Sequence, residues 1–317
     1  MFSTLPAFAL DFANYGGDGI NLFSLLTGYL VMNSYARSRS GREFWHKRIR
    51  RLLPLYYVML LFYLIKDWSW FMQEPLSILR SVLLLNYVLP STVSYYYNAL
   101  NLLGTIPIFM MFYAAIPWIS KHIKKIEGAF VLLLSGTLIR LYIPAVYLRL
   151  FGGSCPYEAI YTTVSYFWEK AVYFLCGIVL YYGKRDDRVP QALVYLLFLW
   201  AIGARYSFLN LLGIATFPLL AAILLCYPIP LPQCVMRPLR WLDELGMGLL
   251  VVQLPMLTWY RDLYVGRYGT DPHGVALIPL FLLPYLAAIA VHYAVELPGQ
   301  KLVDKLARRR AQDGSHS

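Results

Sequence analysis

The chain has 317 residues, of which 59% are hydrophobic and only 14% are charged, and its net charge is +11. A soluble domain carries about 25% charged residues, so this composition excludes an ordinary soluble protein. In lipid, only helices and closed barrels satisfy the hydrogen bonds of the backbone, and the apolar runs here are too continuous for the alternating strands of a barrel. We therefore predict an all-α fold, a polytopic helical bundle in a membrane.

A series of apolar runs follows the chain from its start. They lie near residues 1–13, 20–35, 52–66, 78–89, 101–119, 129–147, 171–183, 191–203, 206–227, 246–260 and 274–295. A membrane-spanning helix needs about 20 residues, so the shorter runs must extend into flanking aromatic or polar residues. Tyr and Trp are abundant at the margins of these runs, which is typical of the membrane interface.

Basic residues gather in the stretches between the apolar runs. The basic stretches are 36–51, 120–126, 184–189, 229–241 and the residues after 298. Loops rich in Lys and Arg stay on the cytoplasmic side of a membrane, so we predict that all five are cytoplasmic. This placement, together with contact to anionic lipid, explains the basic charge without a nucleic-acid partner.

The side assigned to these loops limits the number of crossings. An even number must lie between residues 52 and 119, so one of the three runs there, 78–89, should be re-entrant or interfacial. The first run, 1–13, is short for a span and contains Pro6. Counting it, we predict about ten transmembrane helices in a domain over 1–300. A basic cytoplasmic tail should follow over 301–317, and its residues 307–317 should be disordered.

The four cysteines indicate neither a disulfide framework nor a metal site. Three of them lie in or beside apolar runs, and no pair has the spacing of a CxxC motif. The cysteines are Cys155, Cys176, Cys226 and Cys234.

Two early blocks resemble one family. Gly19–Leu30, with the sequence GINLFSLLTGYL, resembles the segment GVdlFFvlSGyL of the membrane-bound acyltransferase-3 family, with Thr27 in the place of a serine. Phe44–Tyr56 resembles the family's F..rR..RllPlY, and Arg48 and Arg51 fall on its two arginines.

Two later blocks carry the same resemblance, in the same order as in the family. Leu103–Pro117 is similar to the family's WSlsvE..FYl..P. Leu242–Pro255, followed by Val295–Pro298, is similar to lG..S.giYLvH.P and the closing lvE.P. The resemblance implies an integral O-acyltransferase of the bacterial inner membrane. Such an enzyme transfers an acyl group, usually acetyl, from acyl-CoA to a hydroxyl of a glycan or of a lipid-linked sugar.

The chain departs from the family at its acid–base positions. The family has a histidine near the end of its first helix, and the ionisable residue nearest to that place here is Asp11. The family's glutamate in the third block falls on Phe109, and its late histidine falls on Gln253. A catalytically inactive relative, or a transporter-like membrane protein for lipids or glycans, is therefore the alternative to an active enzyme.

Arg48 and Arg51 are the candidate residues for binding the donor. Because they are three positions apart, they face the same way on a helix. Their guanidinium groups could hold the phosphates of coenzyme A or of lipid headgroups.

Asp11 is the candidate general base, since desolvation favours the neutral form of a carboxyl group and would raise its pKa toward a useful range. As an aspartate beside Gly16 and Gly17, it could equally be a turn residue.

Arg140, Glu169 and Gln253 are the candidate residues of a substrate cavity. A charge in the middle of a span, as at Arg140, usually faces a polar cavity or pairs with a buried acid. Glu169 and the adjacent Lys170 could also be interface residues, and Gln253 could join two helices. Glu296 could hold a helix end or pair with a loop arginine.

Overall fold

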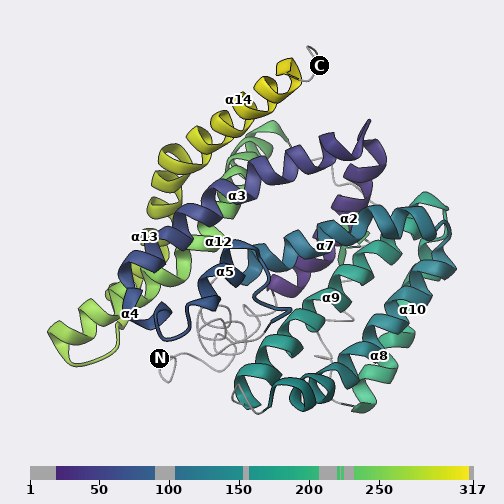
Figure 1. Cartoon of the computed structure of the whole chain (residues 1–317), viewed down its shortest axis with the longest axis horizontal. Helices are drawn as coiled ribbons and strands as arrows, with labels where there is room; N and C mark the ends of the chain where they lie inside the picture. Colours follow the sequence, from purple (N-terminus) through teal and green to yellow (C-terminus); the bar gives the residue numbers. More distant parts are fainter. Residues whose placement is uncertain are drawn as a thin grey trace. The chain divides into compact units, whose positions relative to one another are not determined.

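The computed structural model describes residues 19–89, 104–152, 157–206, 220–221, 223–224 and 232–313. Every regular element in these ranges is helical (Figure 1), which confirms the all-α prediction for the described part of the chain. The chain divides into two compact units. Unit 1 comprises residues 42–107 and 231–317, and unit 2 comprises residues 2–41 and 108–230.

The helices of unit 2 are arranged around α9. Its elements are α2 (Gly19–Arg37), most of α7 (Thr105–His122), α8 (Ile126–Phe151), α9 (Tyr157–Arg185) and α10 (Val189–Tyr206). Helix α9 packs against α2, α8 and α10. The consecutive helices α8 and α9 lie side by side, and Figure 1 shows α10 next to them.

Two glycines allow α2 and α9 to approach closely. A Cβ atom on Gly28 would overlap the backbone of Phe174, and one on Gly177 would overlap the backbone carbonyl of Leu25. Small residues at a crossing let two helix backbones come together, as is common among helices in membranes. The glycine of the block that resembles the family therefore has a structural role here.

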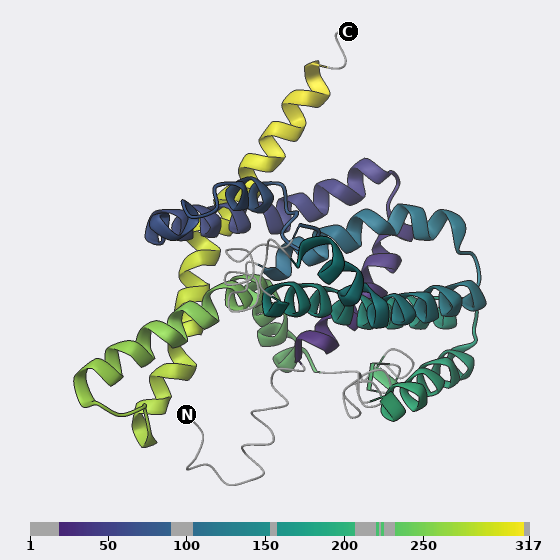
Figure 2. The same cartoon turned by 60° about the horizontal axis from the view of Figure 1, so that its bottom comes forward.

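Unit 1 combines the region after α2 with the C-terminal region. Its elements are α3 (Gly41–Lys66), α4 (Trp68–Phe71), α5 (Leu76–Val82), α12 (Gln233–Tyr268), η2 (Gly274–Ala276), α13 (Leu277–Val291), η3 (His292–Glu296) and α14 (Leu297–Asp313). Helix α12 ends at Gly269, whose φ of 71° is the left-handed cap that glycine adopts readily. The chain then returns in α13, which packs against α12. Figure 2 shows α14 continuing from this hairpin toward the C-terminus.

Several predicted loops are helical instead. Helix α3 begins at Gly41 and so carries most of the basic stretch, and α12 already begins at Gln233. Helix α14 continues to Asp313, beyond the point at which we expected disorder. Lys, Arg and Leu, which make up much of these stretches, form helices readily, so the helix can continue past the apolar run.

Within the run at 78–89, only residues 78–82 are helical, and they are the end of the seven-residue helix α5. At about 1.5 Å per residue, this helix is far too short to cross a bilayer. The structure thus agrees with the expectation that this run does not cross fully. The predicted spans 1–13 and most of 206–227 lie outside the described residues.

Within the described ranges, two helical segments are long and apolar enough to cross a membrane, Ile126–Phe151 and Gly274–Ala307. Large apolar side chains on both are exposed, as a lipid-facing surface requires. Examples are Val131, Leu138, Ile278, Leu282 and Leu286. This supports an association with the membrane by length and composition.

Candidate functional site

A basic face of α3 begins the site. Arg50 and Arg51 follow Lys47 by three and four positions, so each lies next to Lys47 on the surface of the helix. Pro54 follows one turn later, and Gly299 of α14 packs directly on its ring, where a Cβ atom would overlap it. The close approach of α14 thus occurs beside the basic residues of α3.

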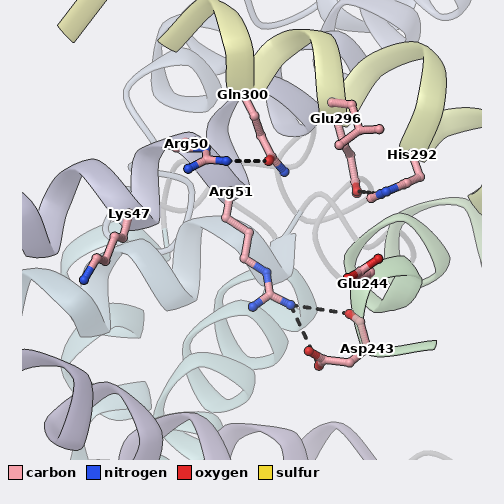
Figure 3. Close-up of a pocket in the computed structure, with 9 residues that line it drawn as sticks. Lys47, Arg50, Arg51, Asp243, Glu244, His292, Glu296 and Gln300 are labelled. Atoms are coloured by element: carbon pink, nitrogen blue, oxygen red, sulfur yellow. Dashed lines mark hydrogen bonds and ion pairs between the residues drawn. The ribbon is translucent and has the colours of Figure 1, made fainter. Parts of the chain in front are cut away.

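These basic residues line a pocket of about 410 Å³ within unit 1 (Figure 3). Three helical segments form it: α3, the first turns of α12, and the stretch from η3 into α14. The lining residues are Lys47, Arg50, Arg51, Asp243, Glu244, His292, Glu296, Leu297 and Gln300. Its volume falls in the range of about 300–1,000 Å³ that is typical of small-molecule sites.

The two arginines of the pocket are held only loosely. Nη2 of Arg51 lies 3.9 Å from Oδ1 of Asp243 and 3.5 Å from the backbone carbonyl oxygen of the same residue. Nη2 of Arg50 lies 3.3 Å from Oε1 of Gln300, and its Nε lies 3.4 Å from Oδ2 of Asp304. Both guanidinium groups are exposed, and such long contacts between exposed groups contribute little to stability. A bound anion could therefore displace them at small cost.

A π-helical turn, η3, forms the opposite wall of the pocket. The backbone N–H of Leu297 donates to the carbonyl of His292, five residues earlier. Pro298 has no N–H to donate to the carbonyl four residues before it, which explains why the α-helical pattern widens at this point. Turns of this kind occur frequently at functional sites.

The π-helical turn holds a buried histidine–carboxylate pair. Nδ1 of His292 lies 2.7 Å from Oε2 of Glu296, and both side chains are buried (Figure 3). The second carboxylate oxygen of Glu296, Oε1, is buried and has no hydrogen-bond partner among the described residues. It faces Gly248 of α12, where an added Cβ atom would lie 3.4 Å away.

Unit 2 contains a second cluster of charged side chains. Nζ of Lys170, which is 5% exposed, lies 2.5 Å from Oδ1 of Asn21 on α2 and 3.0 Å from Oε1 of Glu169. Nη2 of Arg140 on α8 lies 3.8 Å from Oε2 of Glu169. The cluster therefore connects α2, α8 and α9.

The structure brings together some of the predicted site residues. Arg140 and Glu169 form an ion pair, as expected for a charge in the middle of a span. Gln253 belongs to unit 1, on α12, whereas this ion pair belongs to unit 2. Asp11 lies outside the described residues.

The two predicted donor-binding residues have different surroundings. Arg51 lines the pocket, whereas Arg48 is not among the lining residues, and its guanidinium carbon lies 5.4 Å from the ring centroid of Phe44. Neither Arg50 nor His292 is among the residues predicted for the site from the sequence. The signal for His292 was its position four residues before Glu296 inside an apolar run, a spacing that places two side chains on one helix face.

A comparison of the chain with family models, with curated proteins and with solved structures finds no match. The pocket itself and the resemblance of the four sequence blocks are the features that indicate a function.

Proposed function

We propose that this chain is an integral membrane O-acyltransferase of the bacterial inner membrane, with about ten transmembrane helices. It transfers an acyl group, which we propose is acetyl, from acyl-CoA to a hydroxyl of a cell-surface glycan or glycolipid. The observation that carries the proposal is that one pocket combines three basic side chains with a buried histidine–carboxylate pair. Phosphate binding and proton transfer are the two tasks that acyl transfer from coenzyme A requires of a site.

The basic face of α3 suits the donor. Coenzyme A is a polyanion, and guanidinium groups bind phosphate oxygens with two parallel hydrogen bonds. Arg50 and Arg51 are exposed and only loosely held, so they can turn toward a bound phosphate. Lys47 adds a third positive charge on the same face, although 2.7 Å separates its Nζ from Oε1 of Glu43.

The position of the pocket along α13 agrees with a donor that arrives from the cytoplasm. From Leu277 to His292 the chain rises by about 22 Å at 1.5 Å per residue, most of the thickness of a hydrocarbon core of about 30 Å. The pocket is thus near the end of the span that leads into the basic tail. By the positive-inside rule, that end is cytoplasmic.

Transport of a lipid or glycan is the second candidate function. The buried cluster of Lys170, Glu169 and Arg140 favours it, because ionisable side chains within membrane helices also mark transport pathways. An inactive relative of the enzymes would have the same fold without transfer.

The test is transfer of label from radioactive acetyl-CoA by the purified protein in lipid nanodiscs, with a glycolipid extract as the acceptor. We expect label in the glycolipid fraction. If no acceptor gains label, the result would contradict the enzyme assignment and favour the transport candidate.

The donor site is tested by direct binding of coenzyme A. Each charge-assisted contact to a phosphate is worth about 1.5–3 kcal/mol, so Arg50→Ala with Arg51→Ala should weaken binding at least about tenfold. Arg42→Ala removes an exposed charge from the first turn of the same helix and serves as the control. Arg48→Ala should weaken binding less than Arg50→Ala, because Arg48 is not among the residues that line the pocket. Unchanged binding in the double variant would assign the basic face to lipid headgroups.

A further inference from the structure

We propose that His292 is the general base of the acyl transfer and that Glu296 is its positioning residue. This inference rests on the proposed function and names the groups that carry out its chemical step. Among the described residues that line the pocket, His292 is the sole imidazole. It supplies the kind of group that the chain does not have at the family's usual position.

The contact between the two side chains determines which nitrogen can act. A carboxylate only accepts hydrogen bonds, so the nitrogen 2.7 Å from Glu296, Nδ1, carries the proton of the neutral ring. The lone pair of His292 is then on Nε2, on the other side of the ring. A carboxylate in this position also stabilises the imidazolium that forms when Nε2 takes a proton.

The remaining oxygen of Glu296 indicates where an acceptor binds. Glu296 is 4% exposed, and a buried polar atom without a partner, such as its Oε1, is rare in folded proteins. A donor from a ligand would satisfy it. Gly248 of α12 lies beside this oxygen, and a Cβ atom there would be 3.4 Å from it. A polyhydroxylated sugar fits, because one hydroxyl can donate to Oε1 while another reacts.

The reaction then consists of attack by the acceptor hydroxyl, departure of coenzyme A and return of the proton. The acceptor hydroxyl oxygen attacks the thioester carbonyl carbon of acyl-CoA while its proton moves to Nε2 of His292. The carbon–sulfur bond breaks, and the coenzyme A thiolate leaves. The imidazolium returns the proton to the thiolate, so the products are the O-acyl ester and coenzyme A thiol, and His292 is neutral again.

The surrounding charges are compatible with these roles. Lys47, Arg50 and Arg51 face the pocket from α3 and can hold the donor, whereas Asp243 and Glu244 face it from the first turns of α12. Both of these acids are exposed, so neither has the buried setting of Glu296.

The experiment compares His292→Gln, Glu296→Gln and Glu296→Asp with the unmodified protein in nanodiscs, measuring label transfer and binding of coenzyme A. His292→Gln should lower the transfer rate by about 10²–10⁴, the usual contribution of a general base. Glu296→Gln should lower kcat at least about tenfold without changing KM for acetyl-CoA, and Glu296→Asp should recover part of that loss. His273→Gln, which changes an exposed histidine between α12 and α13, is the matched control.

The outcomes distinguish a failure of this inference from a failure of the proposed acyltransferase function. If the unmodified protein transfers label and His292→Gln does so equally fast, His292 is not the base, but the enzyme assignment stands. If the unmodified protein binds coenzyme A and transfers no label, both are wrong. Should His292→Gln fail to elute as a folded protein, Glu296→Gln decides: an unchanged kcat overturns the inference.

Discussion

The two clusters of charged side chains, one in each unit, differ in how closely their helices approach. In unit 2, Lys170 joins α9 to Asn21 of α2, and the same two helices approach closely at Gly28 and Gly177. In unit 1, His292 and Glu296 lie beside an open pocket, and one carboxylate oxygen has no partner among the described residues. A buried charge within a helix therefore does not by itself locate a reactive site. Space for a ligand and an unsatisfied polar atom are what distinguish the pocket.

Because α2 and α9 pack closely in unit 2, a larger side chain should reduce the stability of the protein more there than in unit 1. Gly177→Val would place side-chain carbons on the backbone of α2, which cannot move aside as a side chain can. Overpacking costs about 1–3 kcal/mol, and we expect the upper end of that range here. The measurement is thermal denaturation of the purified protein in detergent, in which the midpoint should fall by many degrees or the folded protein should be lost.

Gly246→Ala is the matched control for this substitution. Gly246 lies on an exposed face of α12, and an added Cβ atom would meet nothing within 4 Å. Replacing a helical glycine by alanine in open space should stabilise the protein by about 0.5–1 kcal/mol. Equal losses in the two variants would contradict the close crossing of α2 and α9.

Removing Lys170 should affect stability more than catalysis. Lys170→Met leaves the side-chain oxygen of Asn21 buried without its donor, a loss of about 1–3 kcal/mol. The rate of acyl transfer per folded molecule should stay the same, in contrast to His292→Gln. Lys305→Met, at an exposed position of α14, should change neither quantity. A reduced rate with unchanged stability would instead place Lys170 in the substrate site.

The smallest effect is expected at the turn between α12 and α13, outside both clusters. A hydrogen bond from Arg261 holds the pKa of the Asp271 carboxyl below its usual range. A lowered pKa in the folded state contributes stability above the unfolded pKa, and this contribution is lost as the pH falls through the folded pKa. Asp271→Asn should therefore lower the denaturation midpoint slightly at pH 7. The difference should disappear at low pH and at high salt, because both groups are exposed. A difference that persists in acid would contradict this ion pair.

Much of the architecture was accessible from the sequence. The positions of α2, α8, α10 and α13 follow from their apolar runs, because burial of continuous apolar surface decides where helices form in such a chain. The pairing of Arg140 with an acid was likewise expected, since an isolated charge in a span is too costly. The sequence did not predict that α3 and α12 extend into their basic stretches. Hydropathy identifies apolar runs, and it does not show where a helix continues through polar residues.

The residues of the pocket depend on tertiary structure. Sequence spacing alone indicated that Arg48 and Arg51 share a face, yet the position of α14 against Pro54 determines that Arg50 and Arg51 line the pocket. His292 is an isolated histidine in the sequence. Its spacing of four residues from Glu296 is compatible with a pair on one helix face, but only the packing of α12 encloses the second carboxylate oxygen beside Gly248. Composition and periodicity determine which segments are helical, whereas the distances between side chains of different helices arise only when those helices pack.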